Sequence, residues 1–205
     1  SDLESRCADG AVAGISGFGE KSAAKILASI TWLKSNSDRC HVDEAQRIAD
    51  RFLAVVRAAP GVQAAETAGS LRRGLETVGD VDILVATPAS SAPSIVSAFL
   101  GAPGVVEVLA RGETKAAVRA QEGRQVDLRV VDPSSYGAAL LYFTGSKEHN
   151  VLLRGRARER GLGLNEYGLF PLDAAGETDF SKPSVAAGDE ESMYRALGLN
   201  PIPPE

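Results

Sequence analysis

The 205-residue sequence is poor in the residues that build disulfide frameworks and soft-metal sites. It contains two cysteines, Cys7 and Cys40, and two histidines, His41 and His149. Two widely separated cysteines make neither a disulfide scaffold nor a CxxC pair that could hold zinc, so the sequence argues against both classes. Because such sparing use of cysteine is typical of a reducing compartment, we expect a cytoplasmic protein.

Long apolar runs are also missing. No stretch approaches the roughly 20 apolar residues that a membrane-spanning helix requires. The N-terminus, Ser1 to Glu4, is polar and unlike a signal peptide. Hydrophobic residues make up 44% and charged residues 24% of the chain, which is typical of a soluble globular protein. We therefore expect no membrane partner.

The formal net charge of −5 at first disfavours a nucleic-acid partner. The excess of acidic residues lies from Pro171 to the C-terminus, however, and residues 1–170 carry equal numbers of basic and acidic side chains. A neutral body with local basic clusters is compatible with DNA binding, although it does not predict it.

Hydrophobic periodicity predicts helices at the start of the chain. Residues 1–35 fit a helix, a tight turn and a second helix from about Glu20 to Leu33, and Asn36 to Asp38 fit a linker. A further helix is predicted over residues 43–58, where apolar side chains recur at helical spacing and Pro60-Gly61 ends the pattern.

The apolar pattern then changes to that of strands, with a helix over residues 93–100. The predicted strands cover residues 62–68, 81–86, 105–109, 116–120 and 126–131. From Ser134 to about Arg160 the chain is again helical, and the remainder is punctuated by glycine and proline. This order predicts an α+β fold with a mixed sheet.

Two carboxylates stand at the start of the apolar run over residues 81–86. Asp80 and Asp82 are two residues apart, so on a strand their side chains project from the same face. Adjacent carboxylates repel unless a proton or a cation lies between them. Their hard oxygen ligands suit Mg²⁺, which takes the rest of its shell from water and phosphates.

A phosphate-binding pattern precedes this pair. Gly69 and Ser70 predict a tight turn whose N–H groups and hydroxyl could cradle a phosphate, and Arg72 and Arg73 follow directly. A phosphate clamp and a metal clamp would thus lie about ten residues apart. The alternative is a turn carrying two surface aspartates.

Asp127 is the candidate for a third metal ligand. It lies inside the strand-like run over residues 126–131, where burial of a carboxylate is costly without a partner. The alternative is a structural salt bridge to Arg129 or Arg73.

Three segments together resemble the family X DNA polymerases, whose best-known member is DNA polymerase beta. They are Gly69 to Asp82, Arg124 to Val131 and Tyr142 to Asn150. Similarity to the bacterial branch lies in Gly17 to Lys21, Leu164 to Phe170 and the ending Pro201 to Glu205. The resemblance covers nearly the whole chain.

This resemblance implies a domain organisation. Residues 1–38 would form a helix-hairpin-helix DNA-binding segment, and residues 39–133 a palm of the nucleotidyltransferase fold. Residues 134–205 would form a mostly helical subdomain that closes over the nucleotide. Bacterial relatives carry a helical domain before this region and a metal-dependent phosphoesterase domain after it, so we expect the chain to be a catalytic core fragment.

The resemblance also implies roles at the catalytic centre. Asp80 and Asp82 would bridge two Mg²⁺ ions, with Mn²⁺ as an alternative ion, and Asp127 would complete the site that holds the primer 3′-OH. The matching nucleotide-binding positions are Gly69, Ser70, Arg73, Gly79 and Arg39 for the triphosphate, Tyr142, Phe143, Thr144 and Gly145 for the pocket wall, Asn150 for the incoming base, and Arg154 on the template side.

Other positions match contacts to DNA. Thr114, Lys115 and Arg129 are expected near the primer. In the hairpin, Gly17 and Gly19 allow the backbone to approach a DNA phosphate, and Lys21 lies in the following helix.

The carbonyls of Ala13, Ile15 and Phe18 could hold a monovalent cation in this hairpin. The alternative for the whole segment is a helical connection capped by glycine.

Three positions depart from the pattern of DNA polymerase beta. Gln125 stands where that protein has an arginine, Lys147 where it has an aspartate, and Val151 where it has a lysine. Gln125 therefore removes a basic group near the primer terminus.

We expect template-directed DNA synthesis by two-metal phosphoryl transfer, in gap-filling repair such as base excision repair. The partners would be gapped or primed DNA and a dNTP, and the protein a monomer. Two alternatives stay open: a nucleotidyltransferase that acts on a non-DNA acceptor, and a DNA-gap-binding fragment without turnover.

Overall fold

The computed structural model describes residues 2–35 and 39–204, with only the backbone described for residues 31–35. The chain forms two compact units, Ser1–Arg39 and Cys40–Glu205. The linker predicted at residues 36–38 lies outside the described residues.

The first unit is a small helical hairpin. Helices α1 (Asp2–Ala8) and α2 (Glu20–Ser35) pack around buried Cys7, Val12 and Ala23. Between them the chain turns with a bond from the Phe18 N–H to the Ile15 carbonyl (2.9 Å) and a φ of +88° at Gly17. The helix, turn and helix predicted for residues 1–35 are therefore present.

A five-stranded mixed sheet is the framework of the second unit. Its strand order is β2-β4-β7-β6-β5. The strands are β2 (Ala64–Thr67), β4 (Val81–Ala86), β5 (Val105–Arg111), β6 (Lys115–Ala120) and β7 (Gln125–Val131). The central pair β4 and β7 is parallel and the other pairs are antiparallel. This arrangement confirms the α+β class and the mixed sheet.

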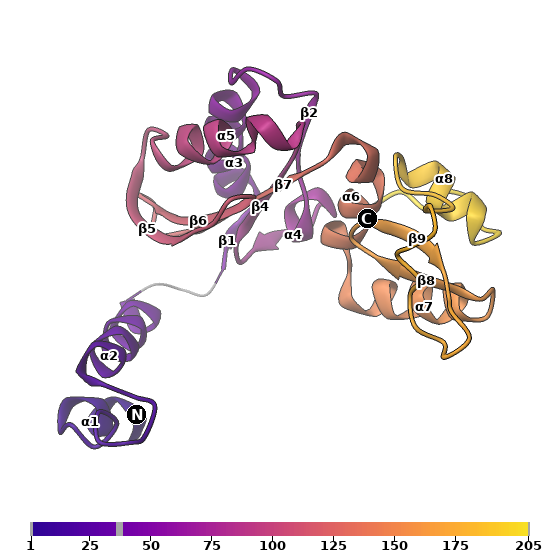
Figure 1. The fold of residues 1–205 in the computed structure, drawn as a ribbon. Helices are drawn as coiled ribbons and strands as arrows, with labels where there is room; N and C mark the ends of the chain where they lie inside the picture. Colours follow the sequence, from indigo (N-terminus) through magenta and orange to yellow (C-terminus); the bar gives the residue numbers. More distant parts are fainter. Residues whose placement is uncertain (1, 36–38, 205) are drawn as a thin grey trace. The chain divides into compact units, whose positions relative to one another are not determined.

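Two helices cover one face of this sheet (Figure 1). They are α3 (Val42–Arg57) and α5 (Ala92–Leu100), and their apolar residues Ile48, Phe52 and Phe99 pack on the alternate strand residues that face them. Alternation along β4 and β7 sends the intervening residues, including Asp82 and Asp127, to the opposite face.

The segment between β2 and β4 has more regular secondary structure than predicted. Gly69 and Ser70 do not form a tight turn but begin the one-turn helix α4 (Gly69–Arg72). Strand β3 (Thr77–Val78) then pairs with β1 (Cys40–His41) in a separate two-stranded sheet. Such two-residue strands leave too short an apolar pattern to be recognised in the sequence.

Helix α6 (Tyr136–Thr144) follows the five-stranded sheet along the chain. Its residues Ala139 and Leu140 pack on Leu84 of β4, on the face opposite α3 and α5. Helix α7 (Lys147–Arg158) follows, so the helical stretch predicted over residues 134–160 is divided at Gly145 and Ser146. Ser146 caps α7 by accepting a bond from the His149 N–H (3.3 Å).

The C-terminal part has its own core. The hairpin β8 (Leu162–Asn165) and β9 (Gly168–Pro171) and helix α8 (Glu190–Ala196) surround buried Leu169 and Met193. Neither the hairpin nor α8 was predicted, because glycine and proline interrupt the hydrophobic pattern there.

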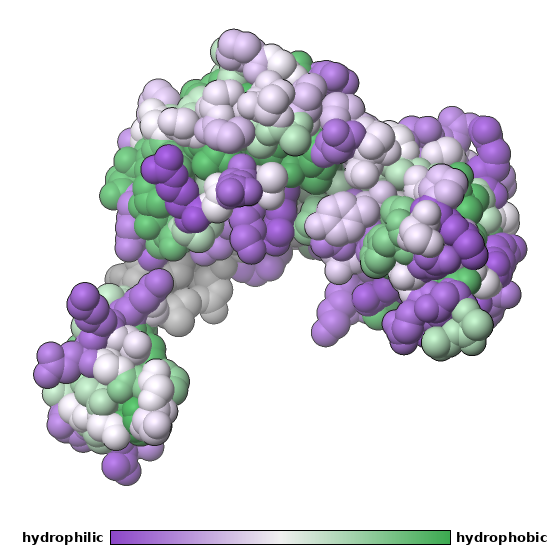
Figure 2. All heavy atoms as spheres, in the orientation of Figure 1, coloured by the Kyte–Doolittle hydropathy of each residue, from purple (hydrophilic) through white to green (hydrophobic). Residues whose placement is uncertain are grey.

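Several large hydrophobic side chains of the described residues are exposed, and two of them lie on the edge strand β5. Figure 2 shows hydrophobic side chains over the region of β5, where Val106 and Val108 are exposed. Among the described residues, no helix is long and apolar enough to cross a membrane.

Candidate active site

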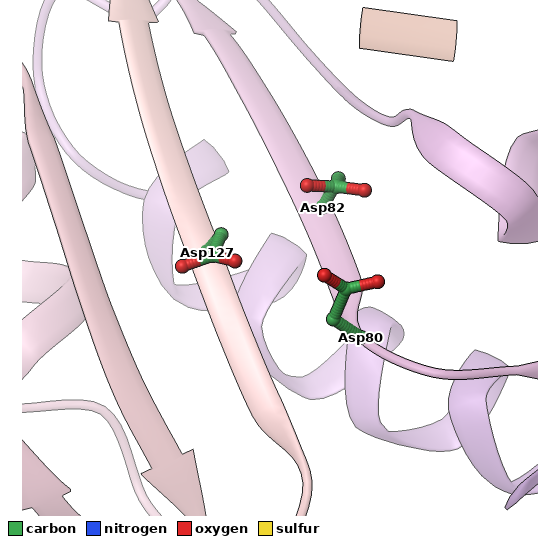
Figure 3. Close-up of side chains that lie close together, drawn as sticks. All are labelled: Asp80, Asp82 and Asp127. Atoms are coloured by element: carbon green, nitrogen blue, oxygen red, sulfur yellow. The ribbon is translucent and has the colours of Figure 1, made fainter. Parts of the chain in front are cut away.

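Three aspartates meet on the face of the sheet opposite α3 and α5. Asp82 on β4 and Asp127 on β7 are direct register partners in the parallel pair, and Asp80 precedes β4 (Figure 3). One carboxylate oxygen from each lies within 4.8 Å of the others. The three side chains therefore form a cluster of hard oxygen ligands of the kind that divalent cations prefer.

Burial and mutual repulsion make this cluster electrostatically costly without a cation. Burial, followed by the charges of Asp80 and Asp127, raises the pKa of Asp82 from 3.8 to about 7. Burial is also the main cause that raises the pKa of Asp127, partly offset by a hydrogen bond from Gln125. A divalent cation would remove this cost, because it compensates all three carboxylates at once.

The raised pKa of Asp82 predicts a pH-dependent stability of the metal-free protein. Between about pH 4 and 7 the folded carboxyl binds more protons than the unfolded one, so its contribution to stability is lost as pH rises through about 7. We expect the melting temperature of Asp82→Asn, measured in EDTA, to gain roughly 3–6 °C on that of the wild type between pH 5 and 8. Two parallel pH profiles would contradict this expectation.

Gly69 lies directly against the Asp82 carboxylate. Its φ is +58°, and a Cβ at this position would lie 2.2 Å from Oδ2 of Asp82. The Ala68 N–H also donates to the backbone carbonyl of Asp82 (2.9 Å). The glycine is therefore required both for the backbone conformation and for the close approach of the carboxylate.

Gly69→Ala is expected to displace Asp82 and to destabilise the second unit by at least about 1–2 kcal/mol, the usual cost of a left-handed alanine. Thermal unfolding should detect the loss, and Mn²⁺ binding should weaken with it. The matched control is Gly155→Ala in α7, where a Cβ meets nothing within 4 Å and the higher helix propensity should stabilise the protein slightly. Equal melting temperatures for the two variants would refute the role of Gly69.

A cavity of about 290 Å³ is lined by most of the predicted nucleotide-binding residues. These are Arg73, Tyr142, Phe143, Thr144, Gly145, Asn150 and Arg154. Ser146 and Lys147 line it as well and were not predicted as contacts. The sequence could have indicated them, because both residues lie inside the segment Tyr142 to Asn150, on which the resemblance to the family rests.

Hydrogen bonds fix the wall of this cavity. Asn150 donates from Nδ2 to the Tyr142 carbonyl (2.7 Å), and Arg154 donates from Nε to the Asn150 carbonyl (3.3 Å). The rings of Tyr142 and Phe143 meet edge to face with centroids 5.3 Å apart. The Asn150 side chain of α7 is thus bonded to the backbone of α6 across the Gly145 break.

The two adjacent arginines serve different parts of the molecule. Arg73 reaches the cavity and donates from Nη1 to the Thr144 carbonyl. Arg72, which the sequence suggested as a second phosphate ligand, instead makes paired bonds of 2.8 and 2.7 Å to Glu190 and one of 2.9 Å to the Thr144 hydroxyl. Its guanidinium is committed to the junction of α4, α6 and α8.

Residues predicted to lie near the primer gather beside Asp127. Lys115 of β6 is the register partner of Arg129 of β7, and the Thr114 carbonyl accepts a bond from Val130 (2.8 Å). All three are exposed, and the Arg129 guanidinium lies 4.8 Å from the centroid of the Phe143 ring.

The structure disfavours the alternative in which Asp127 forms a structural salt bridge. Throughout residues 39–204, no ion pair joins Asp127 to Arg129 or to Arg73. Its carboxylate instead accepts two bonds from Gln125.

Other predicted site residues lie as follows. Ser70 is in α4 and Gly79 directly precedes Asp80. Arg39 is exposed and ends the first unit. In the hairpin, Gly17, Gly19 and Lys21 are exposed, and a Cβ on either glycine would meet open space. The roles assigned to these residues remain predictions.

Comparisons with known proteins identify the family of this chain. The family model described as DNA polymerase beta palm matches residues 39–121, and that described as DNA polymerase beta thumb matches residues 139–205. The DNA polymerase/3′-5′ exonuclease PolX of Bacillus subtilis is 34% identical over 99% of this chain and 34% of its own length.

Two further relatives are vertebrate polymerases. DNA polymerase lambda of Rattus norvegicus is 31% identical over 64% of this chain and 26% of its own length. DNA-directed DNA/RNA polymerase mu of Homo sapiens is 44% identical over 40% of this chain and 15% of its own length. The chain thus spans about a third or less of each of these relatives.

The region matched by the palm model contains Asp80 and Asp82, Asp127 lies between the two matched regions, and the region matched by the thumb model supplies most of the cavity wall. The chain therefore belongs to the family X DNA polymerases, with a palm and a thumb of the DNA polymerase beta type.

Proposed function

We propose that this chain is a DNA-directed DNA polymerase that adds dNTPs to a primer 3′-OH, acting in gap-filling repair such as base excision repair. One observation carries the proposal: Asp80, Asp82 and Asp127 converge, and Arg73, whose charge acts on the Asp82 carboxyl, lines a cavity together with Asn150 and their neighbours. The similarity to proteins named as DNA polymerases supports it.

The three carboxylates would hold two divalent ions, Mg²⁺ or alternatively Mn²⁺. Asp80 and Asp82 would share both ions, and Asp127 would complete the site nearer the primer. When bound, the ions would acidify the primer hydroxyl and stabilise the charge that develops on the triphosphate. The raised pKa of Asp82 supports this assignment, because a cation would relieve the repulsion that contributes to it.

The remaining side chains would bind and orient the substrates. Arg73 would take the triphosphate and would then exchange its hydrogen bond to the Thr144 carbonyl. Ser70, Gly69, Gly79 and Arg39 would add triphosphate contacts. Tyr142, Phe143, Thr144 and Gly145 would wall the pocket, Asn150 would contact the incoming base and Arg154 the template side.

DNA would be held by sequence-independent contacts. Thr114, Lys115 and Arg129 would face the primer, and exposed Gly17, Gly19 and Lys21 would approach a DNA phosphate, with a monovalent cation on the hairpin carbonyls. We further propose a cytoplasmic monomer in which residues 1–38, 39–133 and 134–205 are the hairpin segment, the palm and the nucleotide-closing thumb.

A single-nucleotide gap-filling assay tests the function. The protein is given gapped duplex DNA and dNTPs in Mg²⁺ or Mn²⁺, with a template-free primer in parallel. We expect incorporation of the complementary nucleotide that requires the template. Template-independent addition would favour a nucleotidyltransferase for another acceptor, and salt-dependent DNA binding without incorporation in either metal would favour a gap-binding fragment.

A further inference from the structure

Gln125 contacts the third carboxylate of the aspartate cluster directly. It lies two residues before Asp127 on β7, so both side chains project from the same face of the sheet. Its Nε2 lies 3.1 Å from Oδ1 and 3.0 Å from Oδ2 of Asp127. An ionised carboxylate can only accept hydrogen bonds, so this arrangement requires the NH₂ end of the amide to face Asp127.

The neighbouring residues leave this contact to Gln125. Ala117, the register partner of Asp127 on β6, carries no polar group. Arg119, the register partner of Gln125, donates from Nε to Glu107 (2.8 Å). Within residues 39–204, Gln125 is the one side chain that hydrogen-bonds the Asp127 carboxylate. A neutral donor is thus what orients this ligand.

We propose that Gln125 is a positioning residue that holds the Asp127 carboxylate ready for a divalent cation. The inference rests on the proposed role of Asp127 as a metal ligand. Because one nitrogen contacts both oxygens, one of the two contacts can be given up while the other keeps the carboxylate oriented.

One substitution removes the orienting contact. Gln125→Met preserves the length of the side chain and removes the donor. Gln121→Met is the matched control, because Gln121 is an exposed glutamine in the turn between β6 and β7 and its amide contacts Glu122. Thermal unfolding should give similar melting temperatures for the wild type and Gln121→Met, and shows whether Gln125→Met folds.

The primary readout is Mn²⁺ binding to the chain without DNA or nucleotide, measured from the electron paramagnetic resonance signal of free Mn²⁺. Asp127→Asn identifies the part of the binding that depends on the aspartate cluster. For that part we expect Gln125→Met to raise the Kd about 3- to 10-fold, with the Kd of Gln121→Met unchanged.

Three results would overturn the inference. They are a wild-type protein that binds no Mn²⁺ at the cluster, a Gln125→Met variant that binds as tightly as the wild type, and a loss in Gln121→Met as large as that in Gln125→Met.

Primer extension provides a second readout that separates positioning from structural damage. Gln125 does not line the nucleotide cavity, so Gln125→Met should lower kcat while the KM for dNTP stays within about twofold. A raised KM with unchanged kcat would contradict the inference. If the wild type extended no primer, the proposed function would fail, and the Mn²⁺ measurement would still decide the role of Gln125.

Discussion

Asp82→Asn and Asp127→Asn are each expected to lower primer extension by on the order of 10³-fold or more. Each removes a charged oxygen ligand from the cluster in which carboxylate oxygens lie within 4.8 Å of one another. Metal-ion catalysis supplies several kcal/mol of transition-state stabilisation, and each 1.36 kcal/mol corresponds to a factor of ten in rate. Single-turnover incorporation into gapped DNA measures the loss.

The same substitutions should leave the fold intact. Asparagine has the size of aspartate, and in Asp82→Asn it also removes a carboxylate that burial and two neighbouring charges disfavour. Asp50→Asn on α3 is the control, because Asp50 is exposed on a helix that covers the other face of the sheet. Wild-type extension by either cluster variant would refute the proposed catalytic centre, and so would an equal loss in Asp50→Asn.

Glu190→Ala is expected to destabilise the second unit by about 2–3 kcal/mol, and to lower its melting temperature by roughly 5–10 °C. The side chains of Arg72 and Glu190 are 17% and 25% exposed, and they join α4 of the palm to α8 of the thumb through two bonds. Removal of the carboxylate leaves a largely desolvated guanidinium unpaired. Fully buried pairs cost about 3–5 kcal/mol to break, and partial exposure reduces this figure.

The adjacent residue supplies a matched control. Glu191 pairs with Arg195 on the exposed side of α8, and both side chains are more than half exposed. Glu191→Ala should therefore cost less than about 1 kcal/mol. Because Arg72 also bonds the Thr144 hydroxyl at the cavity wall, Glu190→Ala should in addition raise the KM for dNTP. Similar melting temperatures in the two variants would show that the palm–thumb ion pair does not stabilise the unit.

The two arginines at positions 72 and 73 show where a sequence pattern stops being informative. Successive residues of a helical turn point about 100° apart, so neighbouring arginines must face different surroundings. Arg73 faces the cavity, while Arg72 faces a glutamate 118 residues further along the chain. The sequence showed two phosphate-binding residue types, and the partner of Arg72 depended on how α8 packs against α4.

The thumb shows a second limit. Residues 134 to about 160 were expected to be helical, and the structure divides them into α6 and α7 at Gly145, whose φ is +71°. The hairpin of β8 and β9 was missed because its short strands contain few alternating apolar residues. This hairpin packs around Leu169 and Met193, which come together only in the folded protein.

The sequence by itself determined the local parts of this protein. The two-residue spacing of Asp80 and Asp82 fixes their common face on a strand, and the apolar alternation along β7 fixes which face of that strand is buried. The tertiary structure decided what meets at the site. Asp127 is 45 residues from Asp82 along the chain, and the two carboxylates become neighbours because β7 lies parallel to β4 in this register. Such long-range pairing is set by the packing of the whole sheet and is not encoded in any one segment.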